Sequence, residues 1–241
     1  MPDELKTLDL SSKTFDEFVE FFFARKVVPD REQFDYFLTD LEGQRYDEAV
    51  PSSAGILVAY MTKLFSEFSQ IASKYSLAQI DQGIWAILGA NLRLYEFVFD
   101  ASVPLPNRVE CIRSMYWVYS DFVVKLEAAP DTDLSGLDMW WDLVVHGFWG
   151  PTRPVVAGTY RGDASKLDPE SRVLLDAMFE TLGRILDLPS PEAQRCALHG
   201  LGHLYHPKVH DTVQRYINAN KSELIEGRIA WLEQCRDGTV L

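Results

Sequence analysis

Apolar residues recur at helical spacing along most of this chain, and no other feature constrains its fold as strongly. From Ser53 to Tyr75 they follow the i, i+3, i+4, i+7 pattern of an amphipathic helix, and the pattern returns in 76–88, 107–128 and 169–186. Either Ser53 or Ser52 is expected to cap the first of these helices, and Ser76 the next. Alternating apolar and polar residues form no run convincing enough to predict a sheet. The sequence therefore predicts an all-α protein.

Further helices are expected later in the chain, with short connections between them. The apolar stretch 136–150 predicts one helix, Ser190 and Pro191 begin another, a third follows Pro207, and the last covers about 222–235. About ten helices in succession indicate stacked antiparallel pairs, as in an α-solenoid, within a single domain spanning 1–241.

Two regions fit this helical pattern less well. The segment from about 150 to 168 contains two prolines and three glycines, which predicts a long loop separating an N-terminal helical part from the C-terminal helices, or one short strand around "RPVVAGTY". Near the N-terminus, "FDEFVEFFFAR" and "REQFDYFLTDL" predict short helices, although their aromatic content leaves a strand interpretation open.

Charge restricts the classes of partner. The chain of 241 residues has a formal net charge of −13 and no cluster of Lys and Arg that could bind nucleic acid or an anionic membrane surface. No apolar stretch reaches the roughly 18 residues that a membrane span requires, and the polar N-terminus predicts no export signal. We therefore expect a cytoplasmic protein whose partner is another, basic protein.

Four of the five histidines lie in one short stretch, "CALHGLGHLYHPKVH". On one continuous helix, the spacing of His199, His203, His206 and His210 would place all four imidazoles on one face, as a metal site requires. Pro207 argues against this arrangement, because a proline disfavours helical conformation in the residue before it. The sequence predicts a helix that ends near Tyr205 and a second helix that begins at Pro207.

This helix–turn–helix segment resembles a known repeat. The stretch "ALHGLGHLYHPKVHDTVQRYI" is similar to a HEAT-like repeat of the phycobilin-lyase type, and the resemblance covers residues 190–220 only. It implies a HEAT-like helical array and no particular activity. That family usually has an acidic residue before the proline, where this chain has His206. In the family the matching residues are packing positions, with leucines between the helices and small residues where backbones approach: Ala197, Leu198, Gly200, Leu201, Gly202, Leu204, Pro207, Val209, Val213 and Ile217.

A metal site is an alternative interpretation of the histidines. His199 and His203 are one turn apart on a different helix face from the leucines, and two such imidazoles can bind zinc or another divalent metal. His206, His210 or a carboxylate such as Asp211 would have to supply the third ligand. Gly200 follows His199, so the HExxH motif of metalloproteases is absent.

The aromatic helix "MWWDLVVHGFWG" suggests a second kind of site. Trp140, Trp141 and Trp149 are candidate anchors for a partner if they reach the surface, and core residues if they do not. Asp142 and His146 are spaced i, i+4 and could form the oriented pair of a general base.

No catalytic residues are predicted, because the chain lacks a nucleophile motif and a phosphate-binding loop. The cysteines Cys111, Cys196 and Cys235 are expected to be small buried residues, and no cofactor is expected. The sequence favours a non-enzymatic protein-binding module, in its most specific form an acidic antidote or immunity-type protein that neutralises a basic toxin. The alternatives are a metal-dependent enzyme that uses His199 and His203, and a general scaffold or adaptor.

Overall fold

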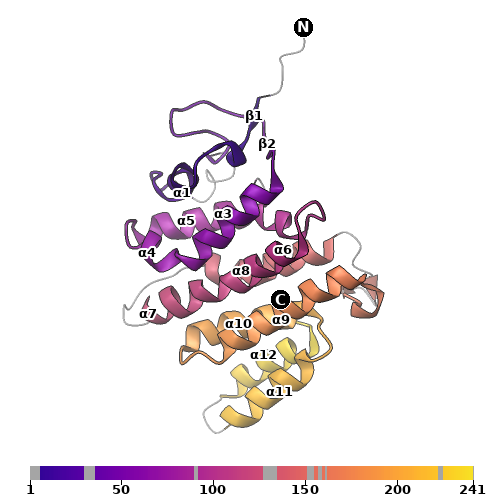
Figure 1. Cartoon of the computed structure of the whole chain (residues 1–241). Coiled ribbons are helices and arrows are strands. Elements are labelled where there is room, and N and C mark those ends of the chain that lie inside the picture. The colour runs from indigo at the N-terminus through magenta and orange to yellow at the C-terminus, as the bar shows by residue number, and fades with distance from the viewer. Residues whose placement is uncertain are drawn as a thin grey trace.

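The chain folds mainly into helices, with only four very short strands in the part that the structure describes (Figure 1). This computed structural model describes residues 6–29, 36–89, 92–126, 135–150, 162–221 and 225–240, and the backbone of 155–156 and 159–160. The prediction of an all-α protein is confirmed. None of the described helices combines the length and apolar character needed to cross a membrane.

The helices follow the apolar pattern of the sequence, except that the stretch from Ser53 to Tyr75, predicted as one helix, forms two helices that meet at Glu67. The α-helices are α1 (Phe15–Phe23), α3 (Ala54–Ser66), α4 (Phe68–Ala72), α5 (Leu77–Leu88), α6 (Leu105–Trp117), α7 (Val124–Leu126), α8 (Ser135–Trp149), α9 (Pro169–Leu186), α10 (Pro191–Leu204), α11 (Val209–Asn220) and α12 (Glu226–Asp237). A π-helical segment, Val118–Val123, joins α6 to α7, and short 3-10 helices cover Leu10–Ser12, Leu94–Phe99 and Ala164–Lys166.

The strands form two minimal pairs. β1 (Thr7–Leu8) pairs in parallel with β2 (Glu48–Ala49), and β3 (Val155–Val156) pairs antiparallel with β4 (Thr159–Tyr160). The predicted irregular segment at 150–168 therefore contains a two-stranded turn and a 3-10 helix, while residues 151–154, 157–158 and 161 lie outside the described residues.

Side-chain caps explain where several helices begin. The Ser53 and Ser190 hydroxyls accept hydrogen bonds from backbone amides three residues later, at 3.3 Å and 3.1 Å. Ser76 forms a reciprocal capping box with Gln79. These hydroxyls satisfy amides that would otherwise lack partners in the first turn, and the predicted N-caps are confirmed.

The helices are arranged in two rows that run along the molecule from the N-terminal to the C-terminal end (Figure 1). In one row α3 packs on α6 and α6 on α9, and in the other α5 packs on α8, α8 on α10 and α10 on α12. α1 lies against α5 at one end, and α11 packs on α12 at the other. Each inner helix therefore has neighbours on two sides, which explains its broad apolar face.

Large side chains fill the space between the two rows. Trp140 of α8 lies edge-on to Phe65 of α3, and its indole N–H donates to the sulfur of Met115 on α6. Gly200 lies beside Trp141, so close that a Cβ at this position would be only 2.5 Å from the Trp141 Cβ. The absence of a side chain at Gly200 thus allows α10 to approach α8 closely.

Candidate functional site

The histidine-rich stretch divides at the residue before His206. α10 ends at Leu204, and Tyr205 takes a left-handed conformation with φ of 52°. α11 starts at Val209, so the predicted break is confirmed, although the second helix begins two residues later than Pro207. The four histidines therefore occupy three separate environments.

His206 is buried and has both ring nitrogens engaged. Its ring stacks on Phe179 with a centroid distance of 4.2 Å, and its Nε2 lies 2.9 Å from the Asp176 carboxylate. The backbone amide of Lys208 donates to Nδ1 at 3.1 Å. Because Nδ1 accepts a hydrogen bond, the proton must be on Nε2, where it is donated to Asp176. His206 and Asp176 line an open pocket of about 400 Å³, but the imidazole has no lone pair available for a metal.

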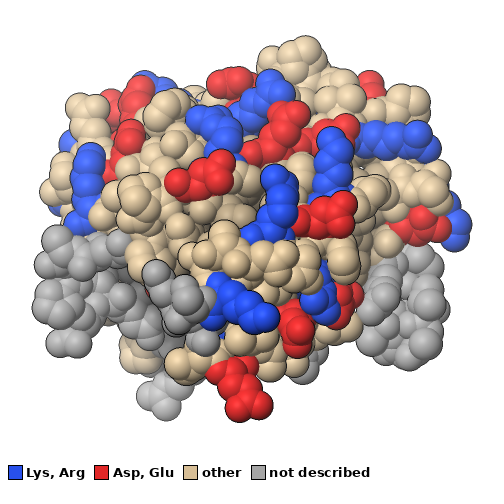
Figure 2. All heavy atoms as spheres, turned by 90° about the horizontal axis from the view of Figure 1, so that it is seen from below, with Lys and Arg blue, Asp and Glu red and all other residues tan. Residues whose placement is uncertain are grey.

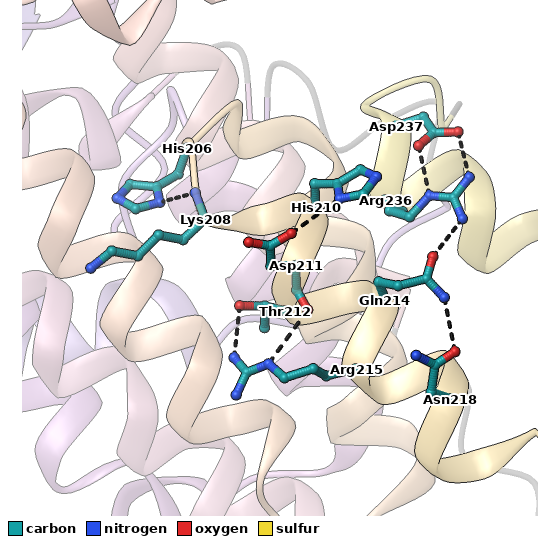
Figure 3. A network of polar contacts seen from close by, with 10 residues as sticks. All are labelled: His206, Lys208, His210, Asp211, Thr212, Gln214, Arg215, Asn218, Arg236 and Asp237. Carbon is teal, nitrogen blue, oxygen red and sulfur yellow. Dashed lines mark hydrogen bonds and ion pairs between the residues drawn. The ribbon is translucent and has the colours of Figure 1, made fainter.

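His210 is exposed on α11 and contacts its neighbour Asp211, with 3.3 Å between Nδ1 and the carboxylate. Figure 3 shows that the rings of His206 and His210 point away from each other. Farther along α11, Gln214 accepts a hydrogen bond from Arg236 of α12. The structure therefore places neither His206 nor His210 beside the other two histidines, and the four-histidine cluster considered from the sequence does not form.

His199 and His203 do face each other on α10. Their Nε2 atoms are 3.2 Å apart, and His203 Nε2 is 3.5 Å from a carboxylate oxygen of Asp142 on α8. His199 Nδ1 lies 3.3 Å from the backbone carbonyl of Asp138, also on α8. Asp142 of α8 therefore contacts His203, which comes about 60 residues later in the chain. The sequence alone suggests a different partner for Asp142, His146 on the same helix.

A second polar group lies one turn earlier along the same two helices. The Arg195 guanidinium contacts both Asp138 and Glu192, and the Cys196 thiol lies 3.2 Å from Asp138. Among the described residues, Asp138, Glu192 and Cys196 form the one group whose possible ligand atoms all lie within 4.8 Å of one another. Burial, followed by the nearby Asp138 charge, raises the pKa of Cys196 well above its ordinary value. The cysteine is therefore a neutral thiol, and both carboxylates already contact the Arg195 guanidinium, so this group is a poor metal site.

The tryptophans proposed as partner anchors lie inside the protein. Trp140 and Trp141 have no exposed surface, and Trp149 is 5% exposed and donates its indole N–H to the Leu204 carbonyl. The condition that they reach the surface is not met, because α8 is covered by helices on both sides. They act as core residues here, as the alternative interpretation of this helix expects.

The cysteines Cys111, Cys196 and Cys235 are all buried and unbridged, as predicted. Burial raises the pKa of both Cys111 and Cys235 to about 12. A nucleophilic thiol needs the opposite shift, toward a stable thiolate.

The acidic excess of the chain is concentrated toward the N-terminus. Residues 1–50 contain 13 acidic and 6 basic side chains, whereas residues 143–241 contain 12 acidic and 11 basic ones. Among the described residues before Leu92, no ion pair joins two of them. Asp16, Glu20, Glu42 and Glu48 are exposed carboxylates without a basic side chain within ion-pair distance in this described part. We refer to these four residues as the acidic end.

Basic side chains near the acidic end have other partners. The guanidinium of Arg25 donates to the backbone carbonyls of Phe21, Tyr36 and Thr39, and Lys63 lies over the ring of Phe15. Arg25 is buried, and its pKa is lowered chiefly by that burial. These two cations therefore form no ion pair with a carboxylate among the described residues.

The loop that carries Glu42 is well ordered by its own hydrogen bonds. Asp40 accepts hydrogen bonds from the backbone of Glu42 and Gln44 and from the Tyr46 hydroxyl. Burial tends to raise the pKa of Asp40, but these hydrogen bonds lower it below its ordinary value. Leu41 is half exposed beside them, and Val50 is 47% exposed. This surface therefore combines uncompensated carboxylates with exposed aliphatic side chains on a preordered loop.

The opposite end of the molecule has a different surface. Figure 2, which views the C-terminal end, shows acidic and basic residues interspersed across the described part of that face. Several of the carboxylates in the C-terminal half are paired, as in Glu170 with Arg108, Glu180 with Arg113, and Asp237 with Arg236.

The sequence interpretation missed the group of polar residues between α8 and α10. A usable signal was present: Asp138 and Asp142 in α8, like His199 and His203 in α10, are polar pairs spaced i, i+4. Comparison with protein families, with curated proteins and with solved structures finds no match to this chain. The HEAT-like resemblance of residues 190–220 therefore stays a prediction, although nine of its ten matching positions are buried, Pro207 being the exception.

Proposed function

We propose that this protein is a non-enzymatic module that binds a basic protein partner through its acidic end. The observation that carries the proposal is the group of exposed, uncompensated carboxylates of Asp16, Glu20, Glu42 and Glu48, beside a preordered loop. Such a surface attracts a basic protein at long range and accelerates the encounter.

The exposed aliphatic residues provide apolar contact area for a partner, which the carboxylates alone do not. Leu41 lies between Asp40 and Glu42, Val50 lies two residues after Glu48, and each exposes about half of its surface. Once a partner has been attracted, burial of apolar side chains gives contacts that resist dissociation. The hydrogen bonds around Asp40 order the loop in advance, which reduces the entropy lost on binding.

The helix arrangement supports an extended scaffold of the solenoid type. Arg113 of α6 pairs with Glu180 of α9, and Tyr116 lies under Arg184 one turn later on both helices. α6 and α9 therefore run in the same direction, as corresponding helices of neighbouring repeats do in a solenoid. We propose that the two rows are such an array and that it holds the acidic end rigidly.

An antidote to a basic toxin is the most specific form of this proposal. An antidote needs a rigid surface opposite in charge to its target, and it needs no chemistry of its own. A scaffold or adaptor for another basic protein would use the same surface, and identification of the partner distinguishes these two roles.

The proposal is tested by reversing charge at one end only. The partner candidates are basic proteins encoded beside this gene, and association is followed by stopped-flow fluorescence between 50 mM and 500 mM salt. Because screening shortens the reach of the attraction, we expect the on-rate to fall steeply with salt. The Glu42→Lys/Glu48→Lys double variant should lower the low-salt on-rate about tenfold or more.

A matched control carries the same change in net charge elsewhere. Asp187, just after the end of α9, and Asp211, on α11, are exposed, and the Asp187→Lys/Asp211→Lys variant should change the on-rate much less. An on-rate that is independent of salt, or that both double variants lower equally, would contradict the assignment of the acidic end.

A further inference from the structure

We propose that His199, His203 and Asp142 bind a divalent transition-metal ion of the zinc class between α8 and α10. Two nitrogen or oxygen ligands at about 2.0–2.1 Å from a tetrahedral zinc ion lie about 3.3 Å apart. The two Nε2 atoms are 3.2 Å apart, and His203 Nε2 is 3.5 Å from the Asp142 oxygen. Both distances therefore match edges of a tetrahedral coordination shell.

The surroundings of His199 favour the tautomer that a metal requires. A carbonyl oxygen can only accept hydrogen bonds, so the contact between His199 Nδ1 and the Asp138 carbonyl places the proton on Nδ1. The Nε2 atom then carries the lone pair and faces His203. Metal-binding histidines are commonly oriented in this way, through a hydrogen bond from the other ring nitrogen to a carbonyl or carboxylate.

The local charge favours a cation. Asp138 and Glu192 share the single positive charge of Arg195, and Asp142 adds another carboxylate near the imidazoles. His203 and Asp142 are partly exposed, so an ion can enter from the solvent without unfolding of the helices.

Binding requires two local adjustments. His203 Nε2 faces two acceptors, His199 Nε2 and the Asp142 carboxylate, so it carries the proton in the absence of metal and must give it up to bind the ion. Asp142 contacts His203, but the three donor atoms do not all lie within 4.8 Å of one another. The partly exposed Asp142 side chain would have to change its rotamer so that its carboxylate also reaches the ion. Three protein ligands leave a fourth position for water, as in open zinc sites.

The site is independent of the proposed partner binding, so either proposal can fail without the other. We would dialyse the purified full chain against a chelator and titrate it with Co²⁺, whose visible absorption reports tetrahedral coordination, and then displace the Co²⁺ with Zn²⁺. We expect one equivalent to bind and to raise the melting temperature, because the ion joins α8 to α10. Affinity should fall toward acidic pH, because protons compete with the metal for the imidazole nitrogens.

Variants identify the ligands. Loss of a supporting residue around a metal typically weakens binding about 10–100-fold, so we expect His199→Ala, which removes a ligand, to weaken it at least about 100-fold. Asp142→Asn keeps an oxygen but loses its charge, and should weaken binding by a smaller factor. His210→Ala removes an exposed histidine of α11 and serves as the matched control, with unchanged affinity.

Circular dichroism checks that each variant is folded. If His199→Ala does not fold, Asp142→Asn still tests the ligands, because its position is partly exposed and the substitution should not disturb the fold. Failure of the native protein to bind Co²⁺ or Zn²⁺ saturably would overturn the proposal. Binding that survives both His199→Ala and Asp142→Asn, or that is lost equally in His210→Ala, would also overturn it.

Discussion

The first 50 and the last 99 residues use their charged side chains in different ways. Toward the C-terminus, acidic and basic residues are nearly equal in number, and arginines such as Arg195 and Arg236 contact carboxylates. Within the first 50 residues, Arg25 contacts backbone carbonyls, and exposed carboxylates such as Glu42 and Glu48 have no ion-pair partner among the described residues. The net charge of the whole chain conceals this difference. Whether an exposed carboxylate has an ion-pair partner depends on which groups the nearby lysines and arginines contact.

The two regions also differ in how they expose leucines, and the largest predicted effect tests this difference. Leu201 is completely buried on α10, whereas Leu41 is half exposed in the N-terminal loop. Leu201→Ala should lower the free energy of unfolding by about 2–5 kcal/mol, through lost burial and the remaining cavity. Leu41→Ala should change it by no more than about 0.5 kcal/mol. Urea denaturation followed by circular dichroism measures both values.

Equal losses of stability in the two leucine variants would contradict the contrast between a packed C-terminal part and an exposed N-terminal loop. A Leu201→Ala variant of unchanged stability would show that α10 is not part of the packed core. In the reverse case, a costly Leu41→Ala would show that the loop contributes to folding and is not simply presented to a partner.

Local signals in the sequence predicted the helices because each signal acts within a few residues. Ser53, Ser76 and Ser190 cap helices through amides in the next turn, and Pro207 restricts the residue just before it. The burial of Leu201 and Leu204 likewise follows from their positions on one face of a single helix. These features were predicted correctly because they depend little on the rest of the fold.

The candidate sites depend on contacts between distant residues, and the sequence alone could not determine them. His199 and Asp138 are 61 residues apart, and only the packing of α10 on α8 brings them together. The exposure of Trp140 could not be predicted for the same reason, because the sequence of an apolar helix does not show whether other helices cover one side of it or both. The distribution of charge, by contrast, was countable from the sequence, but the partners of Arg25 were not.

A carboxylate of the C-terminal part should matter for stability, unlike the free carboxylates of the acidic end. Asp168 caps α9 and accepts hydrogen bonds from the backbone amides of Glu170 and Ser171 and from the Ser171 hydroxyl. Asp168→Ala should lower the free energy of unfolding at pH 7 by about 0.5–2 kcal/mol. Glu48→Ala, which removes an exposed carboxylate without such partners in the described structure, should have almost no effect.

The effect of Asp168 should depend on pH in a defined direction. The hydrogen bond from the Ser171 side chain, followed by that from its backbone, lowers the pKa of Asp168 in the folded protein. The stabilising contribution of Asp168 is therefore fully present above the pKa of about 3.9 that it has in the unfolded chain. It is lost as the pH falls through the lower pKa that Asp168 has in the folded protein. Urea titrations of the native chain and of Asp168→Ala at several pH values measure it. A difference that increases toward acidic pH would contradict this account of the cap.

The smallest predicted effects have opposite signs at the two ends. Glu180 pairs with Arg113 at 3.1 Å on the surface, so Glu180→Gln should destabilise the protein by about 0.2–1 kcal/mol. Glu20 lies four residues after Asp16 in α1, close to the C-terminal turn of the helix, and both features are unfavourable for a negative charge. Glu20→Gln should therefore stabilise the protein by about 0.2–0.5 kcal/mol. Both changes in the free energy of unfolding should be smaller in high salt, because screening weakens attraction and repulsion alike. Melting temperatures at low and high ionic strength measure the two variants side by side. If Glu20→Gln instead destabilised the protein, that carboxylate would have a stabilising partner, and the contrast between uncompensated and paired carboxylates would fail at this residue.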